Sequence, residues 1–502
     1  MDIAKKLIFF FYNSFFDNNP KNDFYIDQLI KNLDYLLLIL INNLTIVLIF
    51  IIIIILLVYL NLNKQTAYYS ILFINILIFF LVLLIFPINI PFTDTYNELN
   101  LLFSNNIQNY LLNTYHSEGF LFFVFRLLHI LIFKFFDLNY YIIININFLF
   151  FIFSIFLVIK YLEKLNLKNY IIFFILIYFN GKWFIHFYEP VNIVWTFNFF
   201  IILLFLFSQQ IKNIFLRKIS LIFLYILSIV NFKAGIVLFI YSVIYGVICR
   251  DNFRNKLFYI ISPIILFYLI NNFVPVNSIG EFNVASSFDI ALEKYLFSKN
   301  YFTLIFNFIA LHALVFTPFI FPLKYLAITV VLVQYSFIIK KIFSKTQNNI
   351  DSIRNFLLTN PYIVIGVLGC FIISFSRDDY NQSRYLSFSI LFQLGFFIFL
   401  IKNNSFNRLK KFITRKIVIT IFIFLYLLNL FIPHQGILFA LGKNYIYKTV
   451  MECLIQNENN NICLPEMFYL TFYDVNNEHY KNFQKSIYIL KEKKLSIFNK
   501  LK

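Results

Sequence analysis

The stretch YYSILFINILIFFLVLLIFPINI (residues 68–90), which runs directly into PFTDTYNELN (91–100), decides the fold class of this chain. The first segment has the length of a membrane crossing, for which about 20 apolar residues suffice. A helix is the expected form, because it satisfies its own backbone hydrogen bonds in lipid. The second segment places two carboxylates, Asp94 and Glu98, where the apolar chain turns polar. The sequence therefore predicts a membrane helix followed by an acidic loop.

Similar apolar segments recur along most of the chain, which has 502 residues, 61% of them hydrophobic and 13% charged. Soluble domains carry about 25% charged residues. The pattern predicts an all-α, polytopic integral membrane protein with roughly 11 to 13 transmembrane helices. The expected spans are 36–60, 68–88, 140–160, 170–187, 190–208, 219–235, 236–250, 256–273, 302–342 as one or two, 356–375, 385–401 and 413–432.

The same pattern divides the chain into three parts. Residues 1–67 form an N-terminal segment with one span, residues 68–432 a transmembrane domain, and residues 433–502 a polar tail. Two long polar loops, 89–118 and 274–300, interrupt the transmembrane domain. The net charge of +18 lies mainly in short connectors, as the positive-inside rule predicts for cytoplasmic loops. We therefore expect a lipid bilayer rather than nucleic acid as partner, with both long loops and the tail on the external face.

Two acids in the first long loop are the leading candidates for chemistry. In a helix, Asp94 and Glu98 would share one face, because they lie four residues apart. Such a pair could bind a divalent cation, or one acid could take a proton from an acceptor hydroxyl. The alternative is a solvated, acidic helix start.

The segment NTYHSEGFLFFVFRLLHILIF (113–133) ends this loop with His116 and Glu118 and continues as an apolar helix that carries Arg126. An arginine at membrane depth is costly unless it meets an anion or a cavity. A lipid phosphate is one such anion, and a snorkelling structural arginine is the alternative. His129, on the same helix, is expected to be a packed residue.

Two later segments carry further polar residues next to spans. In NGKWFIHFYEPVNIVWTFNFF (180–200), Glu189, Asn192 and Trp195 suit the lip of a cavity or an aromatic interface belt. In SFSRDDYNQSRYLSFSILF (374–392), two arginines bracket two aspartates. Arginine binds phosphate through two parallel hydrogen bonds, so this pair could hold a lipid phosphate or pyrophosphate. The alternative is an Arg–Asp cluster that closes a loop.

Cys453 and Cys463 flank the polar segment LIQNENNNI in the tail. An oxidising compartment would favour a disulfide between them, and two free thiols are the alternative.

Together these motifs resemble the GT-C superfamily of membrane glycosyltransferases, which use lipid-phosphate-linked sugars. They resemble more closely an uncharacterised bacterial multi-spanning family with an Asp/Glu loop, a His-Asn-Glu-His-Arg motif, a Trp helix and a late Ser-Arg-Tyr. Gly119 and Phe120 replace the last two residues of the second motif. The matching residues are Asp94, Glu98, His116, Glu118, Glu189, Asn192, Trp195, Arg384 and Tyr385.

The resemblance implies a GT-C-like arrangement with external juxtamembrane helices, in a bacterial inner membrane. It implies transfer of a sugar from a polyprenyl-phosphate-linked donor to an envelope glycan or lipid acceptor at the external face. Asp94 would be the base or a metal ligand and Glu98 its assistant, so that a divalent cation is the one cofactor suggested. The remaining expected roles are donor phosphate binding by Arg377 and Arg384, acceptor binding by His116 and Glu118, and sugar binding by Glu189 and Trp195.

Two other functional classes stay open. The first is a transporter or flippase of a lipid-linked or anionic substrate, which needs polar groups within the spans and often broken helices. Charges within the expected spans are sparse, which favours the transferase. The second is a non-catalytic membrane subunit of envelope assembly, in which the tail recruits a partner. The substitutions at Gly119 and Phe120 leave this class open.

Overall fold

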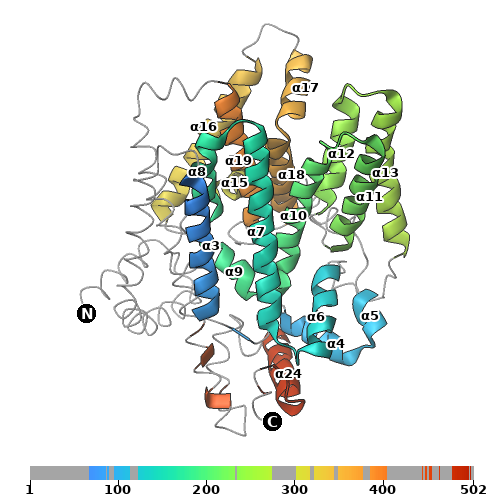
Figure 1. The fold of residues 1–502 in the computed structure, drawn as a ribbon, viewed down its shortest axis with the longest axis vertical. Coiled ribbons are helices and arrows are strands. Elements are labelled where there is room, and N and C mark those ends of the chain that lie inside the picture. The colour runs from blue at the N-terminus through green and yellow to red at the C-terminus, as the bar shows by residue number, and fades with distance from the viewer. Residues whose placement is uncertain are drawn as a thin grey trace, which may run out of the picture.

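The fold is known from a computed structural model. It describes residues 67–85, 88–89, 95–112, 122–231, 235–273, 301–316, 321–343, 349–376, 385–403, 444, 447–448, 452–454, 463, 478–496 and 498. All regular structure within these ranges is helical, which confirms the predicted all-α class (Figure 1).

Nineteen helices or helical turns follow one another in the described residues, numbered as in Figure 1. They are α3 (Ala67–Ile85), α4 (Thr95–Ser104), α5 (Ile107–Leu112), α6 (Phe123–Phe135), α7 (Tyr140–Lys164), η2 (Lys168–Tyr170), α8 (Ile171–Tyr178), α9 (Trp183–Tyr188), η3 (Pro190–Asn192), α10 (Ile193–Ser208), α11 (Ile214–Asn231), α12 (Ile236–Ile248), α13 (Phe253–Phe273), α15 (Tyr301–Ala313), α16 (Phe321–Phe343), α17 (Asn349–Thr359), α18 (Pro361–Ser376), α19 (Leu386–Lys402) and α24 (Glu478–Glu492).

Several of these helices are long and apolar enough to cross a membrane. Five in the described part qualify singly: Tyr68–Ile85, Tyr140–Lys164, Pro190–Ser208, Ile214–Asn231 and Phe253–Ile270. A sixth is formed if α17 and α18 count as one span with a bend of 93°. The protein is therefore an all-α, membrane-embedded protein. The larger predicted helix count stays a prediction, and the spans expected at 36–60 and 413–432 lie outside the described residues.

Different elements gather at the two ends of the helical body (Figure 1). We call the lower one in this view the α4 end, because α4, α5, α6 and α24 gather there. We call the other one the basic end, because exposed cations lie where helices finish or turn there: Lys160, Lys212, Arg250 and Lys340. Lys164 at the end of α7 donates to Gln210 after α10 (2.6 Å), so these helix ends lie together. The basic connectors between these helices therefore lie away from the candidate site, whereas α24 at the α4 end carries exposed lysines of its own, among them Lys481 and Lys485.

One predicted span is broken. The stretch expected to cross at 170–187 forms α8 and α9, with a turn between them. The Asn180 side chain donates to the carbonyl of Val315 (3.0 Å), and the Lys182 ammonium donates to the carbonyl of Leu314. Both acceptors follow the end of α15, so polar groups of two helix ends satisfy one another within the apolar body. The segment 170–187 is therefore two short helices rather than one continuous helix, and this pairing stabilises the break.

Helices α18 and α19 pack closely because glycines face the partner backbone. A Cβ added at Gly366 would lie 2.6 Å from the backbone nitrogen of Phe392. One added at Gly395 would lie 2.5 Å from the backbone nitrogen of Ile363. Small residues allow such close approach between membrane helices, where van der Waals packing drives association.

Candidate functional site

A buried ion pair forms the centre of the α4 end. Glu98 on α4 and Arg126 on α6 are both fully buried. Arg126 Nε donates to Glu98 Oε2 at 2.8 Å, and Nη2 donates to Oε1 at 2.9 Å. The attraction within a buried ion pair offsets the cost of removing both charges from water only when the geometry is good, as in this arrangement of two parallel hydrogen bonds. The pairing joins α4 to α6 and gives the buried arginine an anion within the protein.

A chain of aromatic and polar groups continues from this pair. The Arg126 guanidinium lies over the Tyr110 ring, 5.2 Å from its centroid. The Tyr110 hydroxyl lies 2.7 Å from His129 Nδ1, and His129 Nε2 lies 3.0 Å from the Tyr140 hydroxyl. A neutral imidazole donates from one nitrogen and accepts at the other, so it can serve both hydroxyls. The chain thereby links α4, α5, α6 and α7.

This arrangement makes the stability of the α4 end depend on pH. Burial, and then the Arg126 charge, lower the pKa of His129 to about 3, compared with about 6.5 in an unfolded chain. Between these values the unfolded chain binds a proton that the folded chain does not. Stability should therefore be complete above about pH 6.5 and fall as the pH drops towards 3. Thermal unfolding in detergent at several pH values measures this loss.

The control is His129→Gln, because glutamine keeps a donor and an acceptor but does not titrate. Wild type should lose more stability than this variant as the pH falls from 6.5 to 4. Equal losses in the two proteins would show that His129 does not carry the effect.

The C-terminal helix covers α4. Ser486 Oγ donates to the carbonyl of Tyr96 (2.9 Å), and the Asn100 amide donates to the carbonyl of Asn482 (3.0 Å). The Tyr96 and Phe483 rings meet edge to face, with centroids 5.7 Å apart. Helix α24 therefore forms part of the candidate site, although it lies near the other end of the chain.

Further contacts tie the tail to the same end. Ser496 Oγ donates to the carbonyl of Asn89 (2.5 Å), and the Asn89 side chain accepts from the Tyr140 backbone (2.8 Å). Cys453 and Cys463 form a disulfide, one of the two alternatives that the sequence left open.

A second group of site residues lies next to the start of α4. The Asn192 amide donates to the Glu189 carboxylate, and the Trp195 and Tyr385 rings meet edge to face, with centroids 5.4 Å apart. The backbone nitrogen of Val191 donates to Thr95 Oγ1 at 3.4 Å. The structure thus brings the first residue of α4, η3, the start of α10 and the start of α19 to one place.

The described residues include about half of the predicted site. Asp94, His116, Glu118, Arg377 and Arg384 lie outside them. Their roles, and the roles assigned to the described candidates, remain predictions. Glu98 and Arg126 bind each other, so a metal or phosphate role for either would require the pair to open. Among the described residues no group of three or more His, Cys, Asp or Glu could hold a metal ion.

Sequence reasoning missed Tyr110 and Tyr140 as partners of the ion-pair network. No local signal marks them among 34 tyrosines. It also treated His129 as a packing residue only, whereas its ring bridges two helices.

Comparison with protein families, with curated proteins and with solved structures finds no match to this chain. The class of protein therefore rests on its fold, an all-α protein embedded in a membrane.

Proposed function

We propose that this protein is a multi-pass membrane glycosyltransferase of the GT-C type. It would move a sugar from a polyprenyl-phosphate-linked donor to an envelope glycan or lipid acceptor at the α4 end. One observation carries this proposal: Thr95 contacts η3, and Trp195 contacts Tyr385. Thr95, which follows Asp94 in the chain, and Tyr385, which follows Arg384, are therefore linked through η3 and the start of α10.

In this mechanism Asp94 takes the proton from the acceptor hydroxyl, as a positioned carboxylate can. The Glu98–Arg126 pair holds α4, whose first residue directly follows Asp94. Arg377 and Arg384 bind the donor phosphate and neutralise the charge that develops on the leaving group. Glu189, already hydrogen-bonded to Asn192, contributes to the sugar pocket.

Two features at opposite ends support an external position for the α4 end. The tail holds the Cys453–Cys463 disulfide, and its helix α24 packs on α4. Disulfides persist in oxidising compartments, which favours an external α4 end. Basic connectors between helices lie at the other end, as expected for the cytoplasmic side, and the lysines of α24 lie in the tail at the α4 end. The disulfide and the basic connectors support transfer at the external face of the membrane.

The test is transfer of label from a lipid-phosphate-linked sugar by the purified protein in lipid vesicles. Asp94→Asn should lower the transfer rate by roughly 100-fold or more, the usual contribution of a general base, and leave the melting temperature unchanged. Asp137→Asn, the same change at another acid of the α4 end, should leave the rate within about twofold. No transfer by the wild type would overturn the proposal, and full activity of Asp94→Asn would remove Asp94 from the mechanism.

Transport is a second candidate, favoured by the break between α8 and α9. Broken helices with backbone carbonyls and a buried charge within the membrane body are typical of transporter binding sites. Lys182 and the Leu314 carbonyl form such an arrangement. Movement of a lipid-linked substrate across vesicles without bond formation would support this class, and transfer of label into a glycan would support the first.

A further inference from the structure

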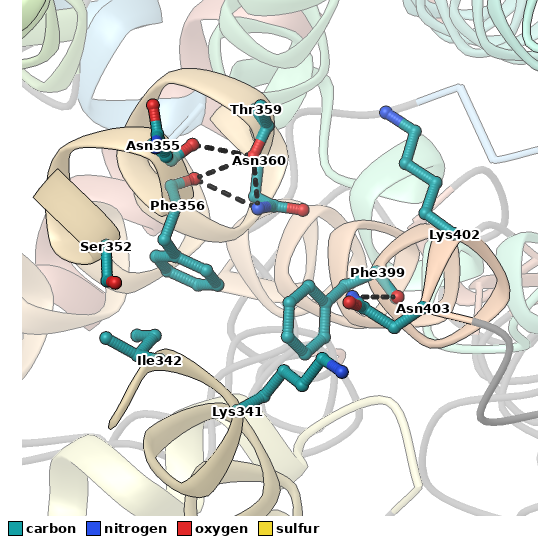
Figure 2. A pocket seen from close by; sticks show the side chains of 10 residues that line it. All are labelled: Lys341, Ile342, Ser352, Asn355, Phe356, Thr359, Asn360, Phe399, Lys402 and Asn403. Carbon is teal, nitrogen blue, oxygen red and sulfur yellow. Dashed lines mark hydrogen bonds between the residues drawn. The ribbon is translucent and has the colours of Figure 1, made fainter. Parts of the chain in front are cut away.

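A polar cavity lies at the basic end, at the opposite end of α19 from Tyr385 of the candidate site. Its volume is about 330 Å³, near the lower limit of about 300 Å³ for small-molecule sites. It is formed by the end of α16, by α17 with its junction to α18, and by the end of α19 (Figure 2). Its ten lining residues are Lys341, Ile342, Ser352, Asn355, Phe356, Thr359, Asn360, Phe399, Lys402 and Asn403.

The lining favours an anion. Two lysines from different helices, Lys341 and Lys402, line the cavity, and none of the ten lining residues is acidic (Figure 2). Lys341 is half-buried and Lys402 is exposed, so water screens the charge of Lys341 less than that of Lys402. Lysine binds phosphate as a point charge.

The cavity wall is held in place by neighbouring helices. Arg354 on α17 donates from Nε to the carbonyl of Ile248 (2.6 Å) and from Nη2 to that of Cys249 (3.2 Å). Thr359 Oγ1 and the Asn360 amide donate to backbone carbonyls of α17. Helix α17 is therefore fixed against the end of α12, and the cavity is a preformed feature.

The surroundings indicate a lipid source for the anion. Helix α17 meets α18 at 93°, so it lies across the direction of the spans. Its Ile350 is 80% exposed, and Phe343 at the end of α16 is 52% exposed. Exposed apolar residues beside a polar cavity are typical of helices at the boundary between lipid tails and headgroups.

We propose that this cavity binds the phosphate of an anionic phospholipid in the leaflet at the basic end. Basic pockets between membrane helices bind such headgroups. The phosphate binds Lys341 and Lys402, and the acyl chains lie along the exposed apolar side of α16 and α17. This site is independent of sugar transfer at the α4 end.

The test is lipid binding to the full chain in detergent, measured by native mass spectrometry with dioctanoyl phosphatidylglycerol. The double variant Lys341→Gln/Lys402→Gln should weaken binding by roughly 30-fold, which is about fivefold for each lysine. Lys340→Gln removes the same charge from an exposed neighbour that does not line the cavity, and should leave binding within about twofold. Lys341→Arg/Lys402→Arg keeps both charges and should also bind.

Two further ligands identify the source of the anion. Dioctanoyl phosphatidylcholine, which carries no net charge, should bind more weakly than phosphatidylglycerol. Inorganic phosphate should not compete at similar concentrations. Equal binding by the double variant and the Lys340→Gln variant would overturn the site, as would equal binding of phosphatidylcholine. Competition by inorganic phosphate at similar concentrations would overturn the lipid as its natural ligand.

Discussion

Replacing Arg126 with methionine should lower the free energy of unfolding by roughly 3 to 5 kcal/mol, the cost of leaving a buried charge without its partner. The variant removes both hydrogen bonds to Glu98, which is fully buried on α4. It also removes the cation above the Tyr110 ring. Denaturation by sodium dodecyl sulfate in mixed micelles, followed by near-UV circular dichroism, measures the loss.

The matched control is the double variant Glu98→Leu/Arg126→Met. Replacing both members of a buried pair by apolar residues is often neutral or stabilising, so the double variant should recover most of the lost stability. If the single variant is as stable as wild type, the pair does not hold α4 to α6. If the double variant is as unstable as the single one, the loss comes from the packing of Arg126 rather than from the charge left on Glu98.

Replacing Gly366 with alanine should lower the free energy of unfolding by roughly 3 kcal/mol, the upper end of the usual cost of overpacking. The new Cβ would lie 2.6 Å from the Phe392 backbone nitrogen and 2.8 Å from its Cα. Backbone atoms within a helix cannot rotate away, so α18 and α19 would have to separate. The same denaturation assay measures the change.

Gly369 on the same helix supplies the control. A Cβ there would meet the ring of Phe388, a side chain, at 2.1 Å. The stability lost in Gly369→Ala should therefore be partly restored by Phe388→Leu, because leucine leaves empty the space that the phenylalanine ring occupied. Trimming Phe388 should not rescue Gly366→Ala. Equal rescue of both glycine variants would show that general loosening, not local contact, sets their stability.

The positions of the long helices could be predicted from the sequence because hydrophobicity and length are local properties. The span predicted at 190–208 corresponds to the apolar helix Pro190–Ser208. The break between α8 and α9 could not be predicted in the same way. Its stabilising partners are the carbonyls of Leu314 and Val315, more than 130 residues further along the chain.

The candidate site was predictable as a set of residue types but not as a set of contacts. Glu98 and Arg126 were both selected, each for its own reason, yet nothing in the local pattern indicates that they bind each other. Their pairing depends on the angle between α4 and α6, which distant contacts such as Ser486 to Tyr96 help to set. A hydrogen bond between residues 390 positions apart cannot be predicted from the spacing of residues within one segment.

The docking of α24 on α4 also has a consequence for biosynthesis. A ribosome makes about 5–20 residues per second, so Ser486 follows Tyr96, 390 residues earlier, by roughly 20 to 80 s. During that delay α4 lies beside the growing helical body without α24 packed on it. The nascent chain therefore passes through a stage in which the spans can be inserted before α24 docks on α4. This docking is one of the last steps of folding.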